Sequence, residues 1–330
     1  MVKGVSKRLN VLAWSVLGSV ILGVGGCAYE RDRERYFDPA MNVCRGTSPV
    51  CYHDWAASQR NGNRVLLYTR TAGFRHANLG PALAAGLNPP LGPGNVVQTT
   101  LKAWLETQGI AVDWTEDVGT FANANLNQYK AVIFASTSRD ALWAHGRAVN
   151  PELAVNTTTG AQLDAARTAL RQYIRAGGGF VGIHNAFGTE YNWPWYEGLL
   201  GNSNFYDHGP LQLGTVEILT RSDPSTKGLP QRWPFKDEWY QLEPFPTRVK
   251  FLAAVDDQSL SNKNTTNPGN PELHPVAWCQ YYDGGRAWTT TLGHDAAAFT
   301  DGSGFPGQAS FKQLILNGIQ SAMGLSPFCT

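Results

Sequence analysis

The 330-residue sequence lacks the short motifs that identify several enzyme classes. It has no Walker loop, and no glycine-rich loop that follows a strand and begins a helix, so a tightly bound nucleotide or dinucleotide is not indicated. It also lacks an H-E-x-x-H pair, so the spacing of its histidines encodes no protease-type zinc site. Any catalytic or metal-binding group must therefore be assembled from residues that are distant in sequence.

The sequence also lacks an excess of charge of either sign. Only 16% of its residues are charged and the formal net charge is +1, whereas 42% are hydrophobic. The composition is that of a globular protein, and the absence of a basic field argues against a nucleic-acid partner.

The apolar run at residues 11–24 is shorter than the ~20 residues of a membrane-spanning helix. Basic residues precede it, and the sequence "VGGC", which ends at Cys27, follows it. This arrangement resembles a bacterial lipobox, so we predict a lipoprotein signal peptide over residues 1–26 and a lipid anchor on Cys27. The mature chain would then lie on the exported side of the cell envelope, periplasmic or extracellular. Ordinary secretion with cleavage nearby is the alternative.

Cysteine is scarce, and four cysteines remain after Cys27. An even number in an exported chain suggests two disulfides, for which three pairings are open. Cys44–Cys51 would close a short loop, and we expect Cys279–Cys329 to tie the C-terminus to an inner strand. The alternative is that some of these thiols stay free and buried.

Residues 27–60 are polar and are interpreted as a tether and lead-in segment, followed by one domain over residues 61–330. The first part of this domain alternates between apolar strands and amphipathic helices, which is typical of a parallel sheet covered on both faces. The predicted elements are strands at 64–69, 110–115, 130–136 and 179–184, and helices at 96–108 and 161–175.

Later segments at 213–220, 249–255, 275–282 and 286–292 look like strands without long helices between them, and the last two flank a hairpin turn, "DGG". A final amphipathic helix is predicted from about 308 to 323. The fold class is therefore α/β: a flavodoxin-like parallel sheet with helices on both faces, extended by antiparallel strands.

Several motifs occur in a specific order: "TRTAGFRH" (69–76), "GGGFVGIHNAFGTEYNWPWY" (177–196), "DEWYQL" (237–242) and "HPVAWCQYYDGGRAWTTTLGH" (274–294). Together they resemble the ThuA-like family, named after a trehalose utilisation protein, over about residues 64–325. The resemblance implies a class I glutamine amidotransferase-like fold and a role in carbohydrate utilisation.

In class I glutamine amidotransferases, the elbow after a central strand carries a cysteine nucleophile. Here "GIHNA" places His184 at that position, and no cysteine lies near it. Glutamine amidotransferase activity is therefore not expected. A histidine at this point instead suits general acid–base chemistry or metal ligation.

Three histidines, His76, His184 and His294, follow predicted strands at their carboxyl ends, where ligands bind in open α/β sheets. We predict that their side-chain nitrogens face one cavity. His184 and His294 should lie within about 8 Å of each other, close enough to share a Zn²⁺ ion, which is a possible cofactor.

Glu238 is the candidate acid–base partner of these histidines, although an Asp-Glu pair on a turn is often only solvated. The aromatic residues after the elbow suit stacking on a sugar, although some must belong to the core. His208 and His274, each beside Gly or Pro, could instead stabilise turns. The candidate substrate-binding residues are Arg75, Asn185, Glu190, Trp193, Tyr196, His208, Asp237, Tyr240 and His274.

Two functions fit these observations. The first is an envelope-anchored enzyme that acts on a sugar or keto-sugar through its histidines. The second is a noncatalytic carbohydrate-binding lipoprotein.

Overall fold

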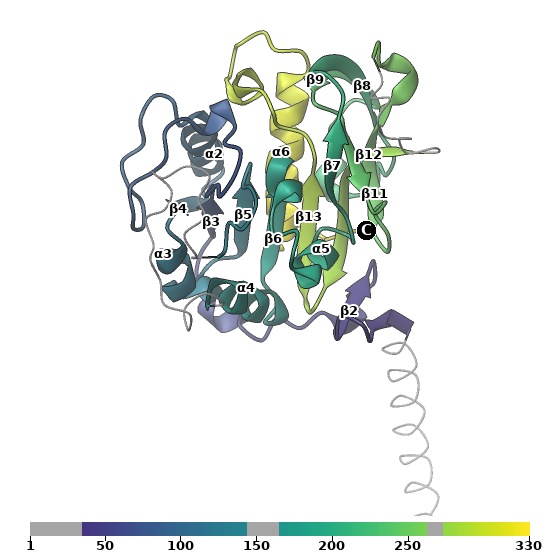
Figure 1. Ribbon diagram of the computed structural model, residues 1–330. Helices are drawn as coiled ribbons and strands as arrows, with labels where there is room; N and C mark the ends of the chain where they lie inside the picture. The colour runs from purple at the N-terminus through teal and green to yellow at the C-terminus, as the bar shows by residue number, and fades with distance from the viewer. Residues whose placement is uncertain (1–34, 144–164, 263–272) are drawn as a thin grey trace, which may run out of the picture.

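The computed structural model describes residues 35–143, 165–262 and 273–330 (Figure 1). The strands are β1 Phe37–Asp38, β2 Val43–Gly46, β3 Arg64–Tyr68, β4 Ala111–Thr115, β5 Ala131–Ala135, β6 Gly179–Ile183, β7 Asn204–His208, β8 Gln212–Ile218, β9 Arg232–Asp237, β10 Tyr240–Glu243, β11 Lys250–Asp256, β12 His274–Tyr282 and β13 Gly285–Thr290. The α-helices are α2 Val96–Glu106, α3 Val118–Asn123, α4 Ala165–Arg175, α5 Pro194–Leu199 and α6 Gln308–Ala322. The predicted signal peptide and Cys27 lie outside the described residues. Within those residues, no helix combines the length and apolarity needed to span a membrane.

One mixed sheet forms the centre of the molecule, with the strand order β4-β3-β5-β6-β13-β12-β11-β8-β9 (Figure 1). The strands from β4 to β13 in this order are parallel, and those from β12 to β9 are antiparallel to their neighbours. β5 and β6 are buried at every position, as expected for strands covered on both faces. The predicted fold class, a parallel sheet extended by antiparallel strands, is confirmed.

Helices cover both faces of this sheet. The apolar faces of α2 and α6 pack into one core, and those of α3, α4 and α5 pack into a second. In α2, the buried residues Val97, Leu101, Trp104 and Leu105 follow the helical spacing seen in the sequence, and Gly109 follows the helix with a φ of +70°. The first part of the helix predicted at 161–175 falls on residues outside the described ranges.

The lead-in segment contributes to the domain. β2 pairs antiparallel with the end of β12, where Gly46 lies opposite Tyr281. Cys44 is bonded to Cys51, which closes the loop after β2. The expected Cys279–Cys329 disulfide is also present and joins β12 to the C-terminus.

β7 and β10 form a separate antiparallel ribbon in which Tyr240 lies opposite His208. These short strands were not predicted from the sequence. The ribbon brings Glu238, Tyr240 and His208 to the carboxyl end of the parallel strands, beside the turn that follows β6.

Candidate functional site

The elbow after β6 has the backbone geometry expected of a strained turn. β6 ends at Ile183, and His184 adopts a φ of +53°, a left-handed conformation that is uncommon for a residue with a side chain. A short 3-10 helix, His184–Gly188, follows directly. At Gly188 an added Cβ would lie 2.2 Å from Oδ1 of Asn185, so a side chain here would displace Asn185 from its hydrogen bond to the carbonyl of Thr137. The strained position is the one that a nucleophile occupies in related elbows.

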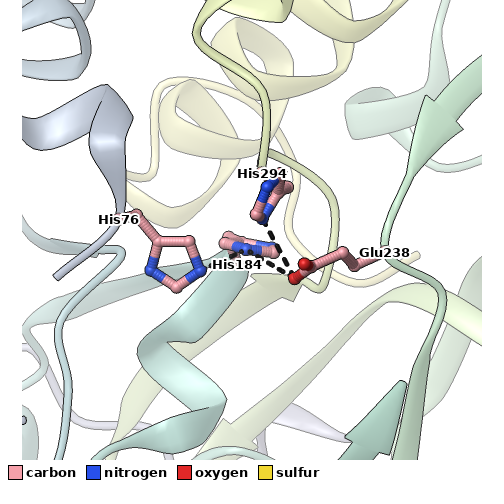
Figure 2. Close-up of side chains that lie close together, drawn as sticks. All are labelled: His76, His184, Glu238 and His294. Atoms are coloured by element: carbon pink, nitrogen blue, oxygen red, sulfur yellow. Dashed lines mark hydrogen bonds and ion pairs between the residues drawn. The ribbon is translucent and has the colours of Figure 1, made fainter. Parts of the chain in front are cut away.

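Four side chains from separate elements converge at this elbow (Figure 2). His76 precedes a short 3-10 helix in the loop after β3, His294 lies in the loop after β13, and Glu238 links β9 to β10. One side-chain nitrogen or oxygen from each of these residues and from His184 lies within 4.8 Å of the others. This geometry agrees with the expectation that the histidines lie within reach of a common ligand. We call the four residues the His–Glu cluster.

The distances within the His–Glu cluster are short. Nε2 of His184 lies 3.1 Å from Nε2 of His76 and 4.0 Å from Oε2 of Glu238. Nδ1 of His294 lies 3.0 Å from the same carboxylate oxygen (Figure 2). The carboxylate therefore faces two of the three rings directly.

The protonation of the His184 ring follows from its hydrogen bonds. Nδ1 lies 2.8 Å from the carbonyl oxygen of Thr291, which can only accept, so Nδ1 carries the hydrogen. The neutral ring must then present a lone pair at Nε2. That nitrogen accepts a hydrogen bond from the Tyr240 hydroxyl at 3.0 Å.

Burial keeps two of the rings neutral. It lowers the pKa of His76 to about 4 and that of His184 well below its usual value. His294 and Glu238 behave differently because they face each other. Burial alone would lower the pKa of His294, but Glu238 raises it; burial alone would raise the pKa of Glu238, but His294 lowers it. The cluster thus contains two neutral imidazoles beside a polarised His–carboxylate pair.

Two buried side chains hold the loop that carries His294. The carboxylate of Asp237 accepts hydrogen bonds from the backbone N–H groups of Gly293 and His294. The amide of Asn78 donates to the carbonyl oxygens of the same two residues, each at 2.9 Å. Burial raises the pKa of Asp237 to about 7. Asp237 is fully buried, so the structure makes it a positioning residue rather than a residue that contacts substrate.

A cavity of about 230 Å³ opens beside the cluster. It is lined by Phe74, His76, Ser138, Arg139, Asn185, Gly188, Tyr191, Phe205, His208, Glu238 and Tyr240. Of the three histidines predicted to face one cavity, only His76 is among these residues. His184 and His294 do not line the cavity, but both His76 and Tyr240, which do, contact the Nε2 atom of His184. The side chain of His294 is 26% exposed. Of the predicted substrate-binding residues, Asn185, His208 and Tyr240 line the cavity.

Several other predicted substrate-binding residues form their contacts away from the cavity. Glu190 is fully buried in an ion pair with Arg167. Tyr196 is fully buried in the core and donates to the carbonyl of Ala186, and Trp193 packs against the same core. These aromatic side chains after the elbow therefore pack α5 against the core.

Arg75 and His274 also lie away from the cavity lining. Arg75 donates to backbone carbonyls of residues 79–81 and to Glu116, which fixes the loop that carries His76. His274 is buried between the carboxylate of Asp257 and the carbonyl of Tyr240. Both side chains therefore stabilise backbone near the site.

Six residues that line the cavity were not among the candidates from the sequence: Phe74, Ser138, Arg139, Gly188, Tyr191 and Phe205. Ser138 and Arg139 follow β5 at the carboxyl edge of the sheet, so the rule that ligands bind at that edge could have found them. Phe74 lies beside His76 within one of the quoted motifs. Its side chain is 68% exposed, which is high for a phenylalanine.

With this geometry established, comparison with known proteins identifies the family. The family model described as ThuA, trehalose utilisation, matches residues 64–322. The chain belongs to the ThuA family. This membership links it in general terms to carbohydrate utilisation.

Two solved structures of ThuA-like proteins share this fold. A ThuA-like protein from Bacteroides uniformis is 22% identical, with a TM-score of 0.55 over 78% of this chain and 91% of that chain. A ThuA-like protein from Parabacteroides merdae is 17% identical, with a TM-score of 0.53 over 80% and 90%. A glutamine amidotransferase from Thermotoga maritima matches with 10% identity and a TM-score of 0.43 over 80% and 99%. No match was found among curated proteins.

Proposed function

We propose that this ThuA family member is an envelope-anchored enzyme that processes a sugar or a keto-sugar at the His–Glu cluster. The observation that carries the proposal is the convergence of His76, His184, His294 and Glu238 within 4.8 Å at a cavity beside the strained elbow. Packing alone does not explain why four ionisable side chains lie at one point.

The chemistry of a carbonyl-bearing sugar fits such a cluster. A hydrolytic or isomerising step on a keto-sugar moves protons at carbons and oxygens next to the carbonyl, and it needs groups that exchange protons near neutral pH. Two chemical modes use these residues. In one, the Glu238–His294 pair transfers the protons directly; in the other, the four residues hold a metal ion that polarises the carbonyl or activates water.

The cavity suits a small polar ligand with apolar faces. Its volume of about 230 Å³ lies below the range of about 300–1,000 Å³ typical for drug-sized ligands. Rings from Phe74, Tyr191, Phe205 and Tyr240 provide flat surfaces, and Arg139 supplies hydrogen-bond donors. This combination favours a single sugar ring.

Thiol chemistry of the amidotransferase type has no support. The elbow carries His184, and each cysteine in the described part of the chain is bonded in a disulfide. The cluster must therefore act through nitrogen and oxygen.

The proposed location rests on the N-terminal sequence together with the two disulfides, since disulfides persist in oxidising compartments. Changing Cys27→Ser should move the protein from the membrane fraction to the soluble fraction. If the variant stays in the membrane fraction without a lipid, residues 11–26 act as a membrane anchor and the lipoprotein assignment is wrong.

The enzyme proposal is tested by a turnover screen of disaccharides and their 3-keto forms, followed by the Glu238→Gln variant on any substrate found. We expect the variant to retain binding and to lose turnover. The alternative, a noncatalytic carbohydrate-binding lipoprotein, is favoured by the burial and neutrality of His76 and His184. It would be supported by calorimetric binding of a sugar without turnover, and by a modest change of affinity in the variant.

A further inference from the structure

We propose that the His–Glu cluster is a binding site for one divalent transition-metal ion of the zinc class. The ligands are Nε2 of His76, Nε2 of His184, Nδ1 of His294 and a carboxylate oxygen of Glu238. The inference deepens the proposed function, since the metal would serve that chemistry, but its evidence is the coordination geometry alone.

The spacing of the donor atoms fits one ion. Bonds of about 2.0–2.1 Å to nitrogen and oxygen place the ligand atoms of a tetrahedral site about 3.4 Å apart. The separations in the cluster are 3.0 Å between His294 and Glu238, 3.1 Å between His76 and His184, and 4.0 Å between His184 and Glu238. These values bracket the tetrahedral separation, and small side-chain rotations would equalise them.

The second hydrogen bond of His184 orients it as a metal ligand. Its Nδ1–H donates to the carbonyl of Thr291 at 2.8 Å, which leaves the Nε2 lone pair directed at the cluster. Metal-binding histidines almost always donate their other N–H to a carbonyl, carboxylate or water in this way. The Tyr240 hydroxyl now donates to this lone pair, so its hydrogen must turn to another acceptor when an ion binds.

Two ring nitrogens of the cluster have no hydrogen bond of good geometry. They are Nδ1 of His76 and Nδ1 of His294, both buried, although Nδ1 of His294 forms an ion-pair contact of 3.0 Å with Glu238. Without an ion, Nε2–H of His76 can donate to the Nε2 lone pair of His184 at 3.1 Å. A cation between these two nitrogens would replace that hydrogen, which would move to Nδ1 of His76.

The donor types select the class of metal. Three imidazoles and one carboxylate suit zinc and similar ions, whereas Ca²⁺ and Mg²⁺ prefer sites made of oxygen. Glu238 and His76 line the cavity, so an ion at the cluster would lie next to any bound ligand. His208, whose Nε2 lies 3.7 Å from Oε1 of Glu238, is outside the set of four and remains free of the metal.

The test measures metal binding, without turnover. The full chain carrying Cys27→Ser is produced without a polyhistidine tag, and its metal content is determined by inductively coupled plasma mass spectrometry. The chelator-treated protein is then titrated with Zn²⁺ by calorimetry and with Co²⁺ by visible absorption. We expect a stoichiometry of about one ion per chain, and absorption bands of a four- or five-coordinate Co²⁺ site.

Two variants and one matched control assign the ligands. Glu238→Gln and His294→Ala should each weaken Zn²⁺ binding at least about 10-fold, while His53→Gln, at a histidine outside this cavity, should bind as the parent protein does. Circular dichroism confirms that each variant is folded, and an unfolded variant is replaced by His76→Gln. The proposal is overturned if the parent protein binds no Zn²⁺ at micromolar concentration, or if Glu238→Gln and His294→Ala bind as tightly as the control.

The two proposals can fail separately. If the protein turns over a sugar after complete chelation, the metal is not required for turnover and the direct proton-transfer mode stands, while the binding titration alone decides the metal site. If the metal binds and no sugar is bound or turned over, the metal site stands and the carbohydrate proposal fails.

Discussion

Two carboxylates, Glu190 and Glu238, both belong to motifs near the elbow, yet their surroundings differ. The carboxylate of Glu190 is fully buried, accepts from the Leu142 N–H at 2.7 Å, and is paired with Arg167. The carboxylate of Glu238 is 14% exposed and faces ring nitrogens of His184, His208 and His294 at 4.0, 3.7 and 3.0 Å. One carboxylate is paired with a permanent cation in the interior, and the other faces rings that are charged only when protonated.

This difference separates a structural charge from a functional one. A buried carboxylate whose oxygens are fully paired holds two segments of chain together, and its removal leaves its cationic partner uncompensated. A partly exposed carboxylate that faces several imidazoles is positioned to bind a cation together with them or to exchange a proton. The contacts of the acid, more than its burial, therefore indicate its role.

The largest expected effect is on the chemistry at Glu238. Glu238→Gln keeps the shape of the side chain but removes its charge, so turnover of a keto-sugar substrate should fall at least about 100-fold. The free energy of unfolding should change by less than about 1 kcal/mol, because the pair with His294 is partly exposed. Steady-state kinetics and urea unfolding measure the two effects. A variant that keeps full turnover would remove Glu238 from the mechanism.

Glu190→Gln should show the opposite pattern. Arg167, whose side chain is 11% exposed, would lose its charged partner, and the free energy of unfolding should fall by about 3 kcal/mol. The folded variant should retain turnover, since Glu190 does not line the cavity. Urea unfolding measures this loss: the midpoint should fall while the dependence of the unfolding free energy on urea concentration stays the same. An unchanged midpoint would show that the Glu190–Arg167 pair contributes little to stability.

Replacing both members of the Glu190–Arg167 pair should recover at least about half of that loss. Glu190→Met with Arg167→Met removes both charges together, and apolar replacement of a buried pair is often neutral. Arg167 lies over the Trp143 ring, 4.3 Å from its centroid, and methionine keeps a favourable contact with an aromatic ring. If the double variant is as unstable as Glu190→Gln alone, packing rather than charge determines the loss.

The smallest effect should come from the rim of the cavity. Phe74→Ala removes an exposed ring, and the KM for a sugar substrate should rise about fivefold, which corresponds to about 1 kcal/mol of stacking. Trp55→Ala is the matched control, because Trp55 is 70% exposed and lies outside this cavity. Equal KM changes in the two variants would argue against a ligand at Phe74.

The parallel half of the fold could be predicted from the sequence because each strand and helix there has its own hydrophobic pattern. The convergence of His76, His184 and His294 followed from the rule that parallel strands present their carboxyl ends at one edge. The β7–β10 ribbon escaped prediction, because two short strands carry little periodic signal. The structural roles of Glu190, Tyr196 and Asp237 could not be predicted either, since these roles depend on partners distant in sequence, such as Arg167.

The most direct test compares the shift in thermal midpoint that saturating Zn²⁺ causes in three proteins, measured by calorimetry. An ion that binds only the folded state raises its stability by about 2.7 kcal/mol at 100 times its dissociation constant. The parent protein and Glu190→Gln should show the same upward shift, although Glu190→Gln starts from a lower midpoint. Glu238→Gln should show a much smaller shift at the same Zn²⁺ concentration, because its affinity for the ion is weakened. An equal shift in Glu238→Gln, or a shift lost in Glu190→Gln, would contradict the distinction between the two carboxylates.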